Sequence, residues 1–135
     1  MKYDILIVDD EEIIIKLVKH LVIKSGLHSN PKGFIGGIDA LEYLNALNNS
    51  NTTQIILLDI NMPNFDGWDF LGILEKSQIN VPIHVIIITS SINKSDKEKA
   101  SLFKMVSSYI EKPVSMQNME QIKELKFLKS LSENY

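Results

Sequence analysis

Short runs of consecutive apolar residues, rich in isoleucine and valine, recur along the chain. Three of them, at 5–8, 55–58 and 83–89, are too short for helices and do not alternate with polar residues. Unbroken apolar character over this length is typical of strands that are buried on both faces of a parallel sheet. We therefore expect these three runs to form strands of such a sheet.

Two shorter segments are candidates for the remaining strands. Residues 108–110 precede Lys112-Pro113, where the proline would end a strand because it cannot donate a ladder hydrogen bond. Residues 32–35 are the fifth candidate, although a proline and two glycines lie within or beside them. Because these residues are poor strand formers, we expect this edge of the sheet to be irregular.

Between the expected strands, apolar residues recur at intervals of three and four, the spacing that gives a helix one apolar face. Ser95 followed by Glu98 matches the capping box that opens a helix. The five expected helices lie at 13–22, 40–47, 68–74, from 95 onward, and 119–131. The order of elements is thus strand then helix, five times. This order predicts a doubly wound α/β fold with helices on both faces of a parallel sheet.

The length and composition of the chain fit one such domain. With 135 residues there is room for a single domain over 1–135, and we expect its core at about 3–131 with no effector domain. Cysteine is absent, which excludes a disulfide scaffold, a cysteine-ligated zinc site and a cysteine nucleophile. No apolar run reaches the roughly 18 residues of a membrane span, and Asp4 lies where a signal peptide would be apolar. We expect a soluble cytoplasmic protein.

The charge of the chain argues against direct binding to nucleic acid. Its 17 acidic residues outnumber its 14 basic ones, the net charge is −3, and every basic residue is a lysine. Proteins that bind nucleic acids usually have a basic face and use arginine for paired contacts with bases and phosphates. We therefore expect protein partners, with no direct contact to nucleic acid or membrane.

Reactive or charged side chains directly follow four of the expected strands. Asp9 and Asp10 end the first strand, Asp59 ends the third, Thr89 ends the fourth, and Lys112 follows the fifth. The carboxyl ends of parallel strands meet at one edge of a sheet, so we expect these side chains to converge there. Taken singly, each has an ordinary explanation as a helix cap or a turn residue. Their joint placement at four strand ends favours a functional site.

Four segments of the chain resemble the receiver domain of bacterial response regulators, in particular small stand-alone receivers of the chemotaxis type. They are 7–11 (IVDDE), 57–67 (LLDINMPNFDG), 89–90 (TS) and 109–113 (YIEKP). The most specific is the Asp-x-x-Met-Pro-x-x-Asp-Gly stretch that begins at Asp59, and the resemblance extends from about Tyr3 to Leu131. It implies a single flavodoxin-like (βα)5 domain with strand order 2-1-3-4-5.

The resemblance implies a phosphorylation-dependent switch of a two-component system or phosphorelay. Asp59 would accept a phosphoryl group from a histidine kinase or phosphotransfer protein. Asp9 and Asp10 would hold Mg²⁺, Asp10 directly and Asp9 through water, together with an oxygen of Asp59 and the backbone carbonyl of Asn61. Clustered carboxylates repel one another, and a hard divalent cation is their natural compensation. The chain would be a signalling regulator rather than an enzyme, with self-phosphorylation and slow dephosphorylation of its own aspartate.

Other residues would sense the phosphoryl group and set its lifetime. The resemblance implies that Thr89 bonds to it, that Lys112 pairs with it, and that Tyr109 is the aromatic side chain that changes position. In this family, residues that tune the lifetime lie two positions beyond the phosphoacceptor and two beyond the threonine, here Asn61 and Ser91. The resemblance also suggests a cis bond between Lys112 and its proline, which costs little for an X-Pro bond.

The expected output is a change in a protein-binding surface. The face would be formed by the fourth helix, the fifth strand and the fifth helix, including Lys104, Tyr109 and Lys123. A downstream protein would bind there, and the chain itself would be a monomer or a weak phosphorylation-dependent dimer.

Two other functions remain open. A phosphatase or hydrolase would use Asp59 as a turnover nucleophile, but such enzymes need a second acid close by, and residues 60–61 supply none. An interaction module would keep the fold without being phosphorylated, although such modules usually lose one of the site residues that are all present here. The remaining candidates are interpreted as structural residues, and they are His20, His28, His84 and Trp68. For Trp68, contact with a partner protein is the alternative.

Overall fold

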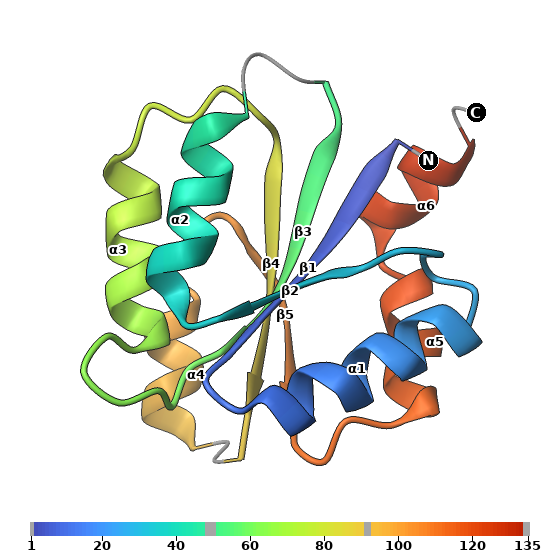
Figure 1. The fold of residues 1–135 in the computed structure, drawn as a ribbon, viewed down its shortest axis with the longest axis horizontal. Coiled ribbons are helices and arrows are strands. Elements are labelled where there is room, and N and C mark those ends of the chain that lie inside the picture. Colours follow the sequence, from blue (N-terminus) through green and yellow to red (C-terminus); the bar gives the residue numbers. More distant parts are fainter. Residues whose placement is uncertain (1, 48–50, 91–92, 134–135) are drawn as a thin grey trace.

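The computed structural model describes residues 2–47, 51–90 and 93–133 and has a five-stranded parallel sheet between two layers of helices (Figure 1). The strands are β1 (Tyr3–Asp9), β2 (Lys32–Ile35), β3 (Thr53–Asp59), β4 (Ile83–Thr89) and β5 (Val106–Glu111). The helices are α1 (Glu12–Lys24), α2 (Gly37–Ala46), α3 (Gly67–Lys76), α4 (Lys94–Ala100), α5 (Met116–Lys123) and α6 (Lys126–Glu133). The strand order β2-β1-β3-β4-β5 confirms the predicted fold class and order. Among these described helices, none is long and apolar enough to cross a membrane.

The sheet separates two hydrophobic cores, because successive side chains along a strand point to opposite faces. In β1, Ile5 and Ile7 face the core formed with α1, α5 and α6, whereas Leu6 and Val8 face the core formed with α2, α3 and α4. Figure 1 shows these two groups of helices on opposite sides of the sheet. All four side chains are at most 2% exposed. The unbroken apolar runs in the sequence are therefore strands buried on both faces, as predicted.

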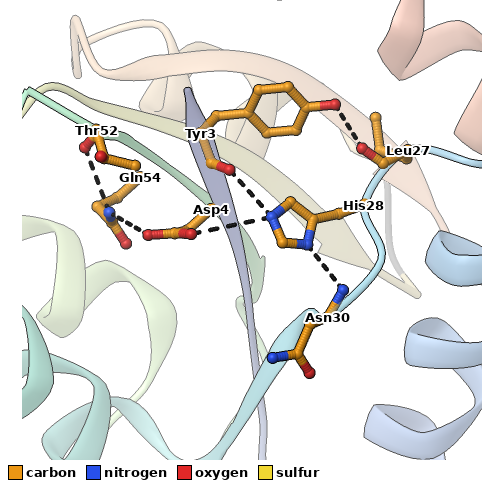
Figure 2. Close-up of polar contacts among 7 residues, drawn as sticks. All are labelled: Tyr3, Asp4, Leu27, His28, Asn30, Thr52 and Gln54. Carbon is orange, nitrogen blue, oxygen red and sulfur yellow. Dashed lines mark hydrogen bonds and ion pairs between the residues drawn. The ribbon is translucent and has the colours of Figure 1, made fainter. Parts of the chain in front are cut away.

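The short edge strand β2 is supplemented by side-chain hydrogen bonds. β2 pairs with residues 6–9 of β1, and the connection between α1 and β2 lies beside the first residues of β1. There the Nε2 of His28 lies 3.1 Å from the carbonyl oxygen of Tyr3, and the Nδ1 accepts from the Asn30 backbone N–H at 2.9 Å (Figure 2). The Tyr3 hydroxyl in turn donates to the carbonyl of Leu27. A longer β2 would pair with the first residues of β1 through backbone hydrogen bonds. At this irregular edge, side-chain hydrogen bonds take their place.

The same contacts extend to β3. Asp4 accepts a hydrogen bond from the Nε2 of Gln54 at 3.0 Å, and its other oxygen lies 3.9 Å from the Nε2 of His28 (Figure 2). His28 is therefore a structural residue that joins the α1–β2 connection to the amino ends of β1 and β3. This agrees with the interpretation from the sequence.

The start of α4 differs from the prediction. Asn93 caps the helix, because its Oδ1 accepts from the backbone N–H of Asp96 at 2.7 Å. Ser95 lies inside the first turn and is not the cap. Asparagine and serine are comparable as caps, so the local sequence allowed both starts.

The predicted fifth helix is two helices in the structure. α5 begins at a capping box between Ser115 and Asn118 and ends before Glu124. After this turn, α6 places Leu128 in the core at 2% exposure. The ring of Phe127 stacks on His84 of β4, with centroids 3.8 Å apart. The turn lets α6 pack against the amino-terminal half of the sheet.

Two glycines of α3 give a matched test of this packing. A Cβ on Gly67 would lie 2.7 Å from the Cα of Ile60 and 2.9 Å from the carbonyl oxygen of Asp59, whereas a Cβ on Gly72 would meet nothing within 4 Å. We expect Gly67→Ala to lower the free energy of unfolding by about 1–3 kcal/mol through overpacking. Gly72→Ala should raise it by about 0.5–1 kcal/mol, because alanine is the better helix former. Urea unfolding at low protein concentration measures both, and equal effects at the two positions would contradict this packing.

Candidate functional site

Three acidic side chains from β1 and β3 meet at the carboxyl edge of the sheet. β1 and β3 are adjacent and parallel, so that Val8 pairs with Leu58 and the aspartates that follow these residues lie side by side. One carboxylate oxygen from each of Asp9, Asp10 and Asp59 lies within 4.8 Å of the others. Asp9 and Asp59 are 3% and 4% exposed, whereas Asp10 is exposed. Within the part of the chain that the structure describes, this is the only group of three or more side chains with such ligand spacing.

Lys112 supplies a positive charge at the same place. Its Nζ lies 3.2 Å from the Oδ2 of Asp9 and 3.7 Å from the Oδ2 of Asp59. The backbone N–H of Lys112 donates to the carbonyl oxygen of Thr89 at 2.7 Å, which fixes the start of this loop against the end of β4. The bond between Lys112 and Pro113 is cis, as the resemblance suggested. One ammonium group against three carboxylates leaves the site with an excess of negative charge.

This excess shifts the ionisation of the buried groups. Burial, and then repulsion from Asp9, raises the pKa of Asp59 to about 6, although Lys112 and a hydrogen bond from the Asn61 backbone N–H act against the shift. For Lys112, burial favours a lower pKa, but the carboxylates of Asp59 and Asp9 outweigh it and raise the pKa above its ordinary value. Asp59 is therefore the carboxylate whose charge is least well compensated. A divalent cation or a further hydrogen-bond donor would stabilise its ionised form.

Asn61 connects Asp59 to Thr89. Its backbone N–H donates to the Oδ1 of Asp59 at 3.1 Å, and its side-chain Nδ2 donates to the Oγ1 of Thr89 at 3.1 Å. Thr89 is 1% exposed at the end of β4. The sequence predicts that the backbone carbonyl of Asn61 binds Mg²⁺ and that Asn61 tunes the lifetime of the phosphoryl group. It does not predict this contact between the Asn61 side-chain amide and Thr89. The position of Asn61 two residues after a strand-end aspartate was the available signal.

The second aspartate of the specific sequence stretch belongs to a helix cap. Asp66 accepts from the backbone N–H of Asp69 at 2.9 Å, and Asp69 accepts from the backbone N–H of Asp66 at 3.0 Å. Gly67, the first residue of α3, donates to the carbonyl oxygen of Ile60 at 3.0 Å. These bonds fold the β3–α3 loop back against the end of β3 and keep Asp66 out of the acid cluster.

Tyr109, the residue expected to change position on phosphorylation, lies beside α4. Tyr109 is half-buried on β5 and lines a hollow of about 190 Å³ against Lys97, Ala100 and Ser101 of α4 and its end. Burial, and secondarily the charge of Asp96, raises the pKa of Tyr109. This tyrosine therefore lies where a movement of α4 would change its surroundings.

Lys123 is not part of that surface. Its Nζ donates to the carbonyl oxygen of Ser25 at the end of α1 and pairs with Glu120 at 3.0 Å. The prediction that Lys123 shares a face with α4 and β5 is wrong, because this carbonyl draws the side chain toward α1. Lys104 is exposed in the α4–β5 connection, and Ser91 lies outside the described residues.

Of the other candidates, the tryptophan and one histidine contact neighbouring side chains, and the second histidine is exposed. Trp68 stacks on Phe103, with ring centroids 6.3 Å apart, and the Nζ of Lys99 lies 4.8 Å from the centre of its ring. The tryptophan thus packs α3 against α4. His84 lies 3.0 Å from the hydroxyl of Ser107 through its Nδ1, and His20 is exposed on α1.

The raised pKa of Asp59 predicts a specific dependence of stability on pH. Between about pH 4 and pH 6 the folded protein keeps a proton on Asp59 that the unfolded chain has released, so stability falls as the pH rises through this range. Asp59→Asn removes the effect. The free energy of unfolding of Asp59→Asn, relative to that of the wild type, should therefore rise by about 1–3 kcal/mol from pH 4 to pH 7.5, after allowance for solvent screening.

Urea unfolding in the presence of EDTA measures this difference. Asp66→Asn is the matched control, because Asp66 accepts a hydrogen bond at an exposed helix cap. A difference between Asp59→Asn and the wild type that does not change with pH would contradict the raised pKa.

Comparison with known proteins supports one family. A family model described as the response regulator receiver domain matches residues 5–124. The probable methanogenesis regulatory protein FilR2 of Methanothrix harundinacea is 28% identical over 126 residues, covering 89% of this chain and 81% of that protein. The uncharacterized transcriptional regulatory protein YcbL of Bacillus subtilis is 31% identical over 112 residues, and the match covers 82% of this chain but only 45% of YcbL.

The fold is shared with solved regulators. A two-component response regulator from Legionella pneumophila superposes with a TM-score of 0.78 at 26% identity, covering 95% of this chain and 98% of that one. The matched sequence region begins within β1, takes in the other four strands, the carboxylate cluster and Lys112, and ends just before α6. With its sequence matched over this region and its sheet shared with solved regulators, the chain belongs to the response regulator receiver domain family.

Proposed function

We propose that this protein is a phosphorylation-dependent signalling switch in which Asp59 accepts a phosphoryl group from a histidine kinase or a phosphotransfer protein. The observation that carries the proposal is the setting of Asp59, nearly buried beside two other carboxylates and 3.7 Å from the ammonium group of Lys112. A carboxylate held in this way can act as a nucleophile toward phosphorus. We place the exchange in the cytoplasm, where kinases have access to ATP.

The donor set fits Mg²⁺. The cluster offers carboxylate oxygens, which are the ligands that hard divalent cations prefer. Asp10, which is exposed, would hold the ion directly, together with an oxygen of Asp59 and the carbonyl of Asn61. Asp9 would act through water, because its Oδ2 pairs with Lys112 and its Oδ1 accepts from the Glu11 backbone N–H at 2.9 Å. When bound, the ion would offset the charge of the carboxylates and of the incoming phosphoryl oxygens.

The transfer step needs positioning more than covalent chemistry from the other residues. An oxygen of Asp59 bonds to phosphorus as the bond from phosphorus to the donor's nitrogen or oxygen breaks, and the donor leaves with that electron pair. The product is an acyl phosphate. Lys112 can pair with the new phosphoryl oxygens by moving from Asp9, and the Thr89 hydroxyl, whose oxygen accepts from the Asn61 amide, can donate its own hydrogen to them.

The phosphorylated state would be read through α4 and β5. Movement of Thr89 toward the phosphoryl group frees space beside β5, and Tyr109 can turn into it from the hollow next to α4. A downstream protein would bind the altered face of α4, β5 and α5, from which Lys123 is excluded by its contact with α1. Asn61 and Ser91 would set the lifetime of the phosphoryl group. The chain would act as a regulator, with self-phosphorylation and slow dephosphorylation of Asp59 as its only chemistry.

The metal assignment predicts an effect on stability. A ligand that binds only the folded state raises the free energy of unfolding, by about 1 kcal/mol at about 10 mM Mg²⁺ if the Kd is millimolar. Asp10→Asn should abolish this gain, whereas Glu12→Gln should keep it, because Glu12 is exposed and pairs with Lys16 at 3.5 Å. Thermal unfolding with and without Mg²⁺ measures the gain. A melting temperature that Mg²⁺ leaves unchanged in the wild type would count against the site.

The phosphoacceptor assignment predicts a covalent adduct. Incubation with acetyl phosphate and Mg²⁺ should add one phosphoryl group, seen by intact mass spectrometry, and Asp59→Asn should add none. Asp66→Asn should behave as the wild type, because Asp66 is engaged in the cap of α3.

The same experiment separates the rival functions. Absence of any adduct on the wild type would favour an unphosphorylated interaction module. Continuous release of phosphate without an adduct would favour a hydrolase. An adduct on Asp59→Asn but not on Asp66→Asn would show that the wrong aspartate has been assigned.

A further inference from the structure

The outer face of α3 carries four residues in a self-complementary arrangement. Asp69, Gly72, Ile73 and Lys76 follow one another at intervals of three, one and three residues and lie on the side of the helix that faces away from the core. The opposite side is buried through Phe70, Leu71 and Leu74. In Figure 1, α3 lies at the outer margin of the molecule. This face is therefore accessible along the length of the helix.

A hollow lies in the middle of this face. It has a volume of about 520 Å³ and is bordered by Phe65 and Trp68 at one end and by Lys76 at the other. Its floor is open at Gly72, because a Cβ there would meet nothing within 4 Å. Beside this opening, the side chain of Ile73 is 47% exposed. A protruding apolar side chain thus stands next to an open, shallow depression that another side chain can enter.

The charges of this face have the same symmetry as its shape. Asp69 and Lys76 are equally far in sequence from the midpoint between Gly72 and Ile73. If two copies of α3 lie antiparallel with a twofold axis at that midpoint, Asp69 of each copy faces Lys76 of the other. Ile73 of each copy then faces the opening at Gly72 of the other, as a knob faces a hole. One surface that matches itself is the requirement for a twofold interface.

The charged groups can make these contacts. One oxygen of Asp69 accepts the backbone N–H of Asp66, and a carboxylate has a second oxygen for a further partner. Within the described residues, the structure shows no ion pair for Lys76. A parallel arrangement would place Asp69 against Asp69 and Lys76 against Lys76, so repulsion between like charges selects the antiparallel one.

We propose that the outer face of α3 docks a second copy of this chain, in an antiparallel pair of α3 helices. This pairing does not require phosphorylation and uses a surface separate from the one proposed for the downstream protein. A single helix from each copy buries less than the roughly 1,200–2,000 Å² of a standard interface. The association is therefore weak, with a Kd of roughly 100 µM to 1 mM.

Sedimentation velocity on the full chain, from about 20 µM to about 1 mM, tests the pairing. The wild type should shift from monomer toward dimer, and the amide NMR signals that move with concentration should be those of α3. Gly72→Leu fills the opening and should weaken the association at least fivefold. Because leucine is the better helix former and the space at Gly72 is open, this variant should be at least as resistant to urea as the wild type, which separates lost association from lost folding.

Exchange of charges tests the orientation. Lys76→Glu and Asp69→Lys should each weaken self-association at least fivefold. An equimolar mixture of the two variants should restore association, because in a dimer of one copy of each variant both contacts between positions 69 and 76 join opposite charges. Lys24→Glu is the control, because Lys24 is likewise an exposed lysine in the last turn of a helix and should leave association unchanged.

A wild type that stays monomeric at about 1 mM would overturn the proposal and leave this face to a different protein. Association that survives both Gly72→Leu and Lys76→Glu would also overturn it, because another surface would then be in use. Failure of the mixed variants to associate would reject the antiparallel orientation.

Discussion

Repulsion between Asp9 and Asp59 is the constraint around which the carboxyl edge of this protein is arranged. The two carboxylates follow paired residues of β1 and β3, and both strands are covered by a hydrophobic core on each face. The strands cannot move apart to relieve the repulsion without opening both cores. The charge is therefore compensated chemically: by a proton on Asp59 below about pH 6, by the ammonium group of Lys112 and, as proposed, by a divalent cation.

Two of the groups that would contact a phosphoryl group already have partners. Lys112 lies closer to Asp9 than to Asp59, and the hydroxyl of Thr89 accepts from the amide of Asn61. A phosphoryl group on Asp59 would add acceptor oxygens and would therefore redistribute these hydrogen bonds and ion pairs. The energy available to move Thr89 and Tyr109 is then the difference between two sets of contacts. Switches between two packings need only a few kcal/mol of this kind.

Much of the architecture could be predicted because it depends on local pattern and on the geometry of parallel sheets. The unbroken apolar runs located three of the five strands, and the strand ends located Asp9, Asp59 and the other side chains that meet there. Features decided by tertiary contacts could not be predicted. No glycine or proline marks the break near Glu124, which follows from the packing of Leu128, and the sequence does not show that Lys123 reaches the carbonyl of Ser25.

The way α6 is attached has a consequence for how the molecule opens. Its described contacts with the rest of the fold centre on the buried Leu128, the half-buried Leu131 and the stacked ring of Phe127, whereas β1, β3 and β4 are enclosed on both faces. Regions with few buried apolar contacts unfold locally at a lower free-energy cost than the global transition. Amide hydrogens of α6 would therefore exchange with solvent while those of the central strands stay protected. Such breathing begins at the edge of the sheet opposite Asp59, and the acid cluster keeps its geometry while α6 detaches and returns.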